Sequence, residues 1–325
     1  MKLVCLIIIV TTFSTLNASV DVVEQQISPT RFQIGLKNNH PYTVTAKTTI
    51  TEGNNTYMIH PTQGAYTVDE PKWTILPANS TIQILIIGPD NTSMGWTWRW
   101  NWNAFKGKLF HTPPRDDNYI FRLPFNGSHT VSSSYKNWSP FGQPPENWHM
   151  AVDWPMPEGT PILAARGGVV SFVREDSDIN GPADATNVVE IEHSDGTMAF
   201  YSHLRLNGAL VTEGESVTEG QPIGYSGNTG FSSEPHLHLH LFYLHYNQGE
   251  PQHKQLPMRF FSANGHGYFP LPTENDRAVD RSQITVDKSA NIEISEHSAQ
   301  LSRRVPRGII SHLWRSSDLV QWVKV

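Results

Sequence analysis

Two residue types that often bind metal ions occur together in one short stretch of the chain. His149 precedes Asp153 by four residues, and Pro155 and Pro157 disfavour a helix there. On an extended chain this even separation places both side chains on the same side of the backbone. The stretch can therefore present an imidazole and a carboxylate to one metal ion.

Two further segments add imidazoles with strand-like spacing. In the Tyr-Ser-His segment at 201–203, the tyrosine and the histidine are expected to share a face. Residues 236–241 alternate strictly, so that His236, His238 and His240 point one way and the intervening leucines point into a core. Packing is a poor explanation for three histidines on one face of a strand. The spacing does not say which of the three binds a metal.

Together these residue types suit a catalytic zinc site. Such a site has three protein ligands drawn from histidine and carboxylate, and an open position for water. Two histidines and one aspartate leave a net charge of about +1, which lowers the pKa of a bound water from about 16 toward roughly 7. Catalysis also needs a proton acceptor and an oxyanion donor that are not ligands themselves. Histidines without such a pattern are expected to be surface or packing residues, and these include His129, His193, His245, His266 and His297.

The elements that must position these side chains are short strands. From residue 127 to 272, apolar bursts are separated by glycine, and no amphipathic helix of ordinary length interrupts them. The expected strands are 161–163, 169–173, 188–192, 198–203, 222–225 and 237–243. This unit is therefore predicted to be all-β.

Residues 19–126 are predicted to form a separate unit. Apolar and polar residues alternate in short bursts, as at Phe32, Ile34 and Leu36, with breaks rich in Asn, Gly and Pro between the bursts. This pattern predicts an antiparallel β-sandwich of roughly 100 residues. The polar, mixed-charge residues 273–325 are expected to form a C-terminal tail.

One strand of the first unit carries a ladder of indoles. Its tryptophans occupy every second position and are expected to lie on one face: Trp96, Trp98, Trp100 and Trp102. Aromatic residues at this spacing usually pack in a core or against neighbouring strands. The alternative is a platform on which sugar rings or the neighbouring domain would stack.

Charge and cysteine content exclude several classes of protein. The 325 residues include 24 Lys and Arg against 30 Asp and Glu, and this net charge of −6 argues against general nucleic-acid binding. The single cysteine, Cys5, lies near the N-terminus within a leader-like segment. Disulfides are therefore not expected in the processed chain, and any metal must be held by His, Asp or Glu. The oligomeric state cannot be read from these features.

Residues 1–18 have the pattern of a signal peptide. Lys2 is followed by an apolar run over 3–10, and Ala18 is a small residue suited to cleavage. The run is shorter than the roughly 20 residues that span a bilayer, and no later apolar run is longer. We therefore expect no transmembrane segment, and export to the periplasm or the cell exterior.

Residues from about 120 to 245 resemble the lysostaphin-like and LytM-like zinc metallopeptidases, which are the M23 family of peptidoglycan endopeptidases. The resemblance covers roughly two fifths of the chain. It runs through MPEGTPILAARGGVV at 156–170, NVVEIEHSDGTMAFYSHL at 187–204 and VTEGQPIGYSGNTGFSSEPHLH at 217–238. It implies a mostly antiparallel β-domain with an active-site groove, and it implies hydrolysis of peptide bonds in the stem or cross-bridge peptides of the bacterial cell wall.

The resemblance also implies a role for each motif residue. His149, Asp153 and His238 correspond to the ligands of one Zn²⁺ ion. His203 and His236 correspond to the catalytic pair, of which one accepts a proton from the attacking water and the other stabilises the oxyanion or protonates the departing amine. Tyr201 is a further candidate oxyanion donor, although packing is its expected role. His240 departs from the family pattern and is expected to lie behind the ligands or at the rim, and Ala151 stands where many members have glycine.

Two features of the sequence bear on competing interpretations. Asp176-Ser-Asp178-Ile-Asn180-Gly181 matches the opening of a calcium-binding loop, but Asn187 stands where that loop needs a bidentate Glu, and Pro182 interrupts it. A solvated loop at the edge of the groove is the favoured interpretation. The alternative function is a noncatalytic relative that binds the wall or activates another hydrolase; such relatives lose ligands, whereas this sequence retains all five matched positions.

Overall fold

A computed structural model of the chain describes residues 19–114, 119–134, 150–246 and 250–261, together with the backbone of four short strands that follow. The predicted signal peptide and His149 lie outside the described residues. Of the predicted tail, only three short strands are described. Among the described residues, no helix is long and apolar enough to cross a membrane.

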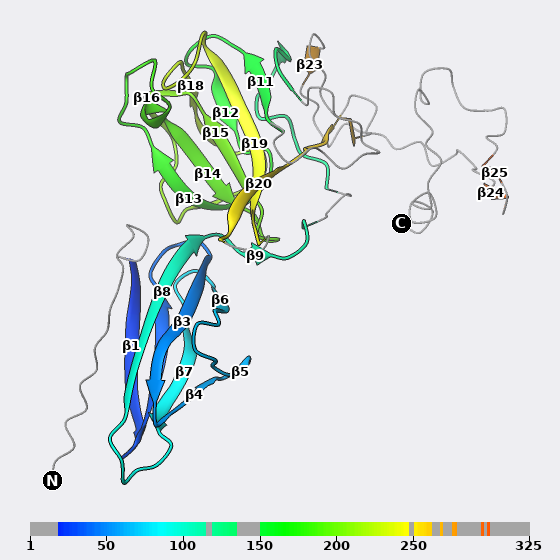
Figure 1. Ribbon diagram of the computed structural model, residues 1–325. Coiled ribbons are helices and arrows are strands. Elements are labelled where there is room, and N and C mark those ends of the chain that lie inside the picture. Colours follow the sequence, from blue (N-terminus) through cyan, green and yellow to red (C-terminus); the bar gives the residue numbers. More distant parts are fainter. Residues whose placement is uncertain are drawn as a thin grey trace.

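The first unit is a sandwich of two antiparallel sheets, as the alternating pattern predicted (Figure 1). One sheet has the order β1 (Val20–Ser28), β2 (Arg31–Asn38), β7 (Thr81–Pro89), β4 (Thr56–His60) and β5 (Gly64–Ala65). The other has the order β6 (Lys72–Leu76), β3 (Val44–Asn54) and β8 (Thr97–Lys106). Each sheet buries one face, so that Leu36 and Ile84 of the first sheet share a core with Ile50 and Leu76 of the second.

The indole ladder packs inside this sandwich. Along β8 exposed and buried residues alternate, and Trp98, Trp100 and Trp102 are only 5%, 2% and 4% exposed. Trp96 precedes the strand and packs against the same core. A platform for sugar rings needs exposed ring faces, so the stacking interpretation is wrong for the three buried indoles, and the packing interpretation is confirmed.

The second unit is built on one large sheet with a smaller sheet beside it (Figure 1). The large sheet has the order β11 (Val152–Pro155), β19 (His236–His245), β15 (Met198–Ser202), β14 (Val188–Glu192), β13 (Gly168–Arg174) and β17 (Ser216–Val217). β20 (Gln252–Leu256) and β9 (Leu109–Phe110) also pair with β19. The smaller sheet has the order β12 (Pro161–Leu163), β18 (Pro222–Ser226) and β16 (Leu204–Ala209).

Short elements complete the described chain. A 3₁₀ turn, η2, covers Ala183–Ala185. The remaining strands form three pairs: β10 (Ser128–Thr130) with β23 (Asn275–Arg277), β21 (Phe260–Phe261) with β22 (Gly267–Tyr268), and β24 (Ile294–Ser295) with β25 (Ser298–Ala299). The described part of the chain is therefore almost entirely β, as predicted.

The two units divide earlier in the chain than the change of composition suggested. β9 pairs in parallel with β19 of the second unit. Phe121, Leu123 and Phe125 belong to the core of the second unit. The structure therefore places the division before Leu109, whereas the sequence pattern predicted it at residue 126. The reason is that the sequence of an apolar segment between two units does not indicate which of the two cores will bury it.

The first unit contacts the second through a largely buried ion pair. Lys106 Nζ lies 2.5 Å from Glu190 Oε1, and the backbone N–H of Thr43 donates to Glu192 Oε2 at 2.8 Å. β9 meets β19 at Leu244 and His245, the opposite end of that strand from His236. These contacts hold the first unit at the far end of the strand that carries the histidine motif.

His193, which follows β14, is expected to make the stability of the chain depend on pH. It is 2% exposed, its Nδ1–H donates to the Gly167 carbonyl at 3.0 Å, and its Nε2 has no hydrogen-bond partner among the described residues. Burial lowers the pKa of His193 to about 4. Between pH 6.5 and 4, His193 therefore binds more protons in the unfolded state than in the folded state. Its contribution to the free energy of unfolding is fully present above pH 6.5 and is lost as the pH falls toward 4.

The measurement is the free energy of unfolding from urea titrations between pH 7.5 and 4. We expect His193 to account for a loss on the order of 3 kcal/mol over this window. His193→Gln, whose amide cannot titrate, should show a pH slope that is smaller by about one proton. Equal slopes for the two proteins would contradict the assignment.

Candidate metal-binding and catalytic site

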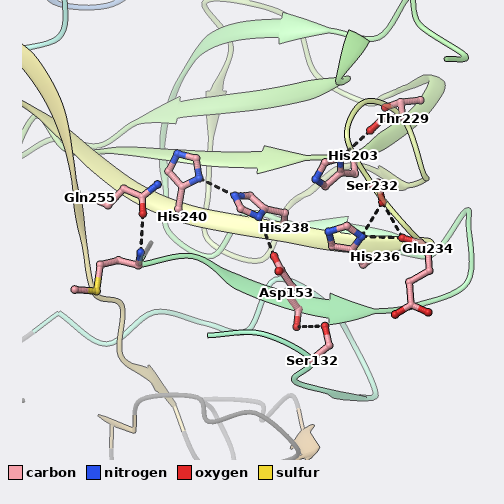
Figure 2. Close-up of polar contacts among 11 residues, drawn as sticks. Ser132, Asp153, His203, Thr229, Ser232, Glu234, His236, His238, His240 and Gln255 are labelled. Carbon is pink, nitrogen blue, oxygen red and sulfur yellow. Dashed lines mark hydrogen bonds and ion pairs between the residues drawn. The ribbon is translucent and has the colours of Figure 1, made fainter. Parts of the chain in front are cut away.

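The histidine motif forms the first half of β19 and has the two faces that its alternation predicted. Leu237, Leu239 and Leu241 are buried in the core of the second unit. His236, His238 and His240 are half-buried on the opposite face (Figure 2). A strand gives this result because successive side chains point to opposite sides of the sheet.

Asp153 reaches this face from the neighbouring strand β11. It is directly paired with His238 across the two strands, and its Oδ1 lies 2.8 Å from His238 Nδ1 (Figure 2). The backbone of Asp153 is also held from its other side, where its N–H donates to the Ser133 carbonyl and its own carbonyl accepts from the Ser132 N–H, both at 2.9 Å. The carboxylate therefore has a well-defined position beside the imidazole.

The pKa of Asp153 is lowered, although two effects oppose each other. Burial raises the pKa, but the hydrogen bond from His238 and the charges available to the surrounding imidazoles lower it by more. The group is therefore an anion at neutral pH. An ionised carboxylate beside an imidazole nitrogen is the donor pair that zinc takes from proteins.

His203 joins the cluster through an unusual backbone conformation. β15 ends at Ser202, which is paired with His238, and His203 follows with φ = +63°. This left-handed residue breaks the alternation of the strand, so the expectation that Tyr201 and His203 share a face is wrong. Tyr201 is fully buried and its hydroxyl accepts a hydrogen bond from the Ala165 N–H at 2.8 Å. Its role is packing, as expected, and it is not an oxyanion donor.

The rings of His203 and His236 lie next to each other, with centroids 4.5 Å apart. The Nδ1–H of His203 donates to the Thr229 carbonyl at 2.7 Å, and that of His236 donates to the Glu234 carbonyl at 2.8 Å (Figure 2). Because a carbonyl can only accept, Nδ1 carries a hydrogen in both rings, and in a neutral ring the lone pair is then on Nε2. Burial lowers the pKa of His203 to about 4, so this ring is neutral at physiological pH.

Four of the five predicted site residues therefore lie together. Ligand atoms of His203, His236 and His238 all lie within 4.8 Å of one another, which makes them a possible metal-binding group among the described residues. Asp153 adjoins them through His238. The fifth residue, His149, lies outside the described residues. The division into three ligands and a catalytic pair stays a prediction, because the imidazoles of His203, His236 and His238 are also close enough together to bind one metal ion.

Backbone groups of the segment 227–234 complete the site, and sequence reasoning missed them. The carbonyl groups of Thr229 and Glu234 orient the two catalytic candidates. Thr229 is itself held, because its hydroxyl donates to the Leu204 carbonyl at 2.7 Å. Gly230 has φ = +73°, and a Cβ there would lie 1.8 Å from Thr186 Oγ1. A carbonyl has no residue-type signature, so the glycine spacing of this segment was the available signal.

The acidic loop packs against the same segment. Asn187, which stands where a calcium loop needs Glu, is buried and donates through Nδ2 to the Ser177 carbonyl at 2.7 Å. Asn180 forms a bridge with Gly230 and donates to the carbonyl groups of Asn228 and Ser232. The loop therefore braces the segment that orients His203 and His236.

Comparisons with known proteins match the part of the chain that carries the histidine motif. Residues 147–253 match the model of peptidase family M23. Peptidoglycan DD-endopeptidase ShyA of Vibrio cholerae is 43% identical over 93 residues, covering 29% of this chain and 20% of that protein. Glycyl-glycine endopeptidase ALE-1 of Staphylococcus capitis is 29% identical over 157 residues, covering 48% of this chain and 41% of that protein.

Among solved structures, the catalytic domain of lysostaphin from Staphylococcus simulans aligns at 28% identity with a TM-score of 0.28, covering 38% of this chain and 87% of that chain. The chain spans between about a fifth and two fifths of the length of the two curated relatives described above. The matched range begins two residues before His149 and contains every predicted site residue. Residues 147–253 of this chain therefore form a domain of peptidase family M23.

Proposed function

We propose that this chain is a zinc-dependent endopeptidase that is exported and hydrolyses peptide bonds in the stem or cross-bridge peptides of bacterial peptidoglycan. The family domain and relatives named as peptidoglycan DD-endopeptidases support the substrate class. The observation that carries the proposal is the convergence of Asp153, His203, His236 and His238 at one place. Asp153 comes from β11, His236 and His238 come from β19, and His203 follows the end of β15. Hydrolysis of an amide requires these side chains to lie close together.

The residues present fit a zinc ion. Asp153 Oδ1 and His238 Nδ1 face each other at 2.8 Å, and they would hold the ion together with His149. When bound, zinc supplies a Lewis acid that polarises the scissile carbonyl and makes water acidic enough to attack near neutral pH. The lowered pKa of Asp153 keeps its carboxylate charged for this role.

His203 and His236 would move the protons of the reaction. Each ring has Nδ1–H tied to a backbone carbonyl, so each offers the Nε2 lone pair to the substrate side of the cluster. A neutral imidazole can accept the proton of the attacking water and later return it to the departing amine. The imidazolium that forms in between can donate a hydrogen bond to the tetrahedral oxyanion.

Two exposed apolar side chains at the rim are proposed to contact the substrate peptide. Phe231 and Ile179 are 79% and 53% exposed, and they flank the bridge between Asn180 and Gly230. Phe231 also precedes Ser232, whose Oγ lies 3.1 Å from His236 Nδ1. Side chains in this position can cover the methyl and methylene groups of a peptide bound at the histidines.

Phe231→Ala is therefore expected to raise KM for peptidoglycan peptides by about 10-fold with a smaller change in kcat, because burial of a phenylalanine contributes roughly 1.5–3 kcal/mol. Steady-state kinetics on a soluble cross-linked muropeptide would measure this. Leu210→Ala is the matched control, since Leu210 is 47% exposed but lies between β16 and β17. An equal change in both variants would reject a substrate contact at Phe231.

The proposed function itself is tested with the purified chain and purified sacculi. Mass spectrometry of the released muropeptides should show new peptide ends, and their identity gives the bond that is cleaved. Elemental analysis should show one zinc ion per chain. A chain that binds zinc and leaves sacculi from several wall types intact would overturn the proposal.

A further inference from the structure

His240 lies directly behind the proposed zinc ligand His238. Its Nδ1 is 3.0 Å from Nε2 of His238, which is the nitrogen that faces away from Asp153 (Figure 2). The ring of His240 is stacked on Phe200, with centroids 4.9 Å apart and planes 27° apart. Asp153, His238 and His240 thus form one continuous chain of polar contacts across two strands.

The protons of this chain follow from its acceptors. The ionised carboxylate of Asp153 can only accept, so in the metal-free protein the hydrogen of His238 lies on Nδ1. The lone pair on His238 Nε2 then needs a donor, and His240 supplies its Nδ1–H. A metal ligand must instead offer the Nδ1 lone pair, which moves the hydrogen of His238 to Nε2. His240 Nδ1 must then accept, and a neutral imidazole can do either because it has two tautomers.

We propose that His240 is a positioning residue that fixes the ring orientation of His238 and complements both of its tautomers, so that Nδ1 is held ready for zinc. This inference rests on the proposed zinc-dependent function. An outer partner of a ligating histidine orients the ring and makes it a better donor. Stacking on Phe200 holds the ring of His240 in place and leaves Nδ1 aimed at His238. The sequence motif placed His240 behind the ligands or at the rim without assigning it this contact.

The first test measures zinc affinity by competition with a chromogenic chelator. His240→Phe keeps an aromatic ring for Phe200 but removes the hydrogen bond, and the zinc dissociation constant is expected to rise by about 10- to 100-fold. His240→Asn places an amide near the position of Nδ1, can donate or accept, and should recover most of the affinity. His253→Phe is the matched control, because His253 is an exposed histidine on β20 that contacts Phe242.

The second test needs no enzymatic activity. Nitrogen-15 spectra of the imidazoles should show the hydrogen on Nδ1 of His238 and of His240 in the metal-free chain, and on Nε2 of both after zinc is added. His240 with its hydrogen on Nε2 in the metal-free chain would overturn the proposal. So would an unchanged zinc affinity in His240→Phe, or a loss that His240→Asn does not recover. A native chain that binds no zinc would instead overturn the proposed function, and with it this inference.

Discussion

Replacing either His203 or His236 with alanine is expected to reduce peptidoglycan hydrolysis by at least about 100-fold while the chain still binds one zinc ion. The two rings are oriented by backbone carbonyl groups and are not part of the Asp153–His238 pair. Removing one ring takes away a proton acceptor or an oxyanion donor, and leaves the proposed ligands in place. Rates of muropeptide release and zinc per chain, both measured on each variant, check the expectation.

The zinc measurement separates two models of the site. If His203, His236 and His238 held the ion as a three-imidazole group, each alanine variant would lose zinc together with activity. His253→Ala is the control for general effects of removing a histidine, since that side chain is exposed and lies on β20. Circular dichroism and the midpoint of thermal unfolding establish that the variants are folded. Retained hydrolysis in either variant would reject the catalytic assignment.

Asp153→Asn is expected to weaken zinc binding by more than the roughly 100-fold that loss of an outer partner can cost, and to abolish hydrolysis in parallel. The substitution keeps the size of the side chain and its ability to hydrogen-bond, but it removes the negative charge. The lowered pKa of Asp153 shows that its surroundings favour the anion, which is the form that a cation attracts. Zinc titration into metal-free protein, followed by activity at each zinc concentration, measures both effects.

Excess zinc should restore part of the activity of Asp153→Asn, since the catalytic pair remains intact. Asp176→Asn is the matched control, because Asp176 is exposed in the acidic loop, where its side chain lies 3.8 Å from Arg174. Full zinc affinity in Asp153→Asn would show that Asp153 is not a ligand. That result would instead support a metal site formed by His203, His236 and His238.

Local patterns predicted the elements of this protein well. The alternation of His and Leu at 236–241 predicted both faces of β19, because successive side chains along a strand point to opposite sides of the sheet. For the same reason the spacing of Trp98, Trp100 and Trp102 predicted their common face. Whether that face was buried depended on a second sheet, and the packing of both sheets into one core answered that question.

Local patterns failed where the backbone departs from the strand. Tyr201 and His203 are two residues apart, yet Tyr201 lies in the core and His203 lies in the site. The cause is the left-handed conformation of His203, which no residue type in the segment indicates. The division between the units was misplaced for a related reason. Phe121 and Phe125 are apolar in either unit, and only contacts with residues far along the chain assign them to one core.

The residue types and their order along the chain, with the family resemblance that they carry, were enough to predict an all-β protein with a family M23 domain. They also predicted which residues form its site, and the roles of those residues stay predictions. Folding in three dimensions supplied the pairing of Asp153 with His238 and the carbonyl groups that orient His203 and His236. It also supplied the contact from His240. These features depend on strand register and on backbone groups, and every residue type carries the same backbone groups. They arise because strands that are distant in the chain pair through hydrogen bonds. The residue type at a single position does not determine which strands pair.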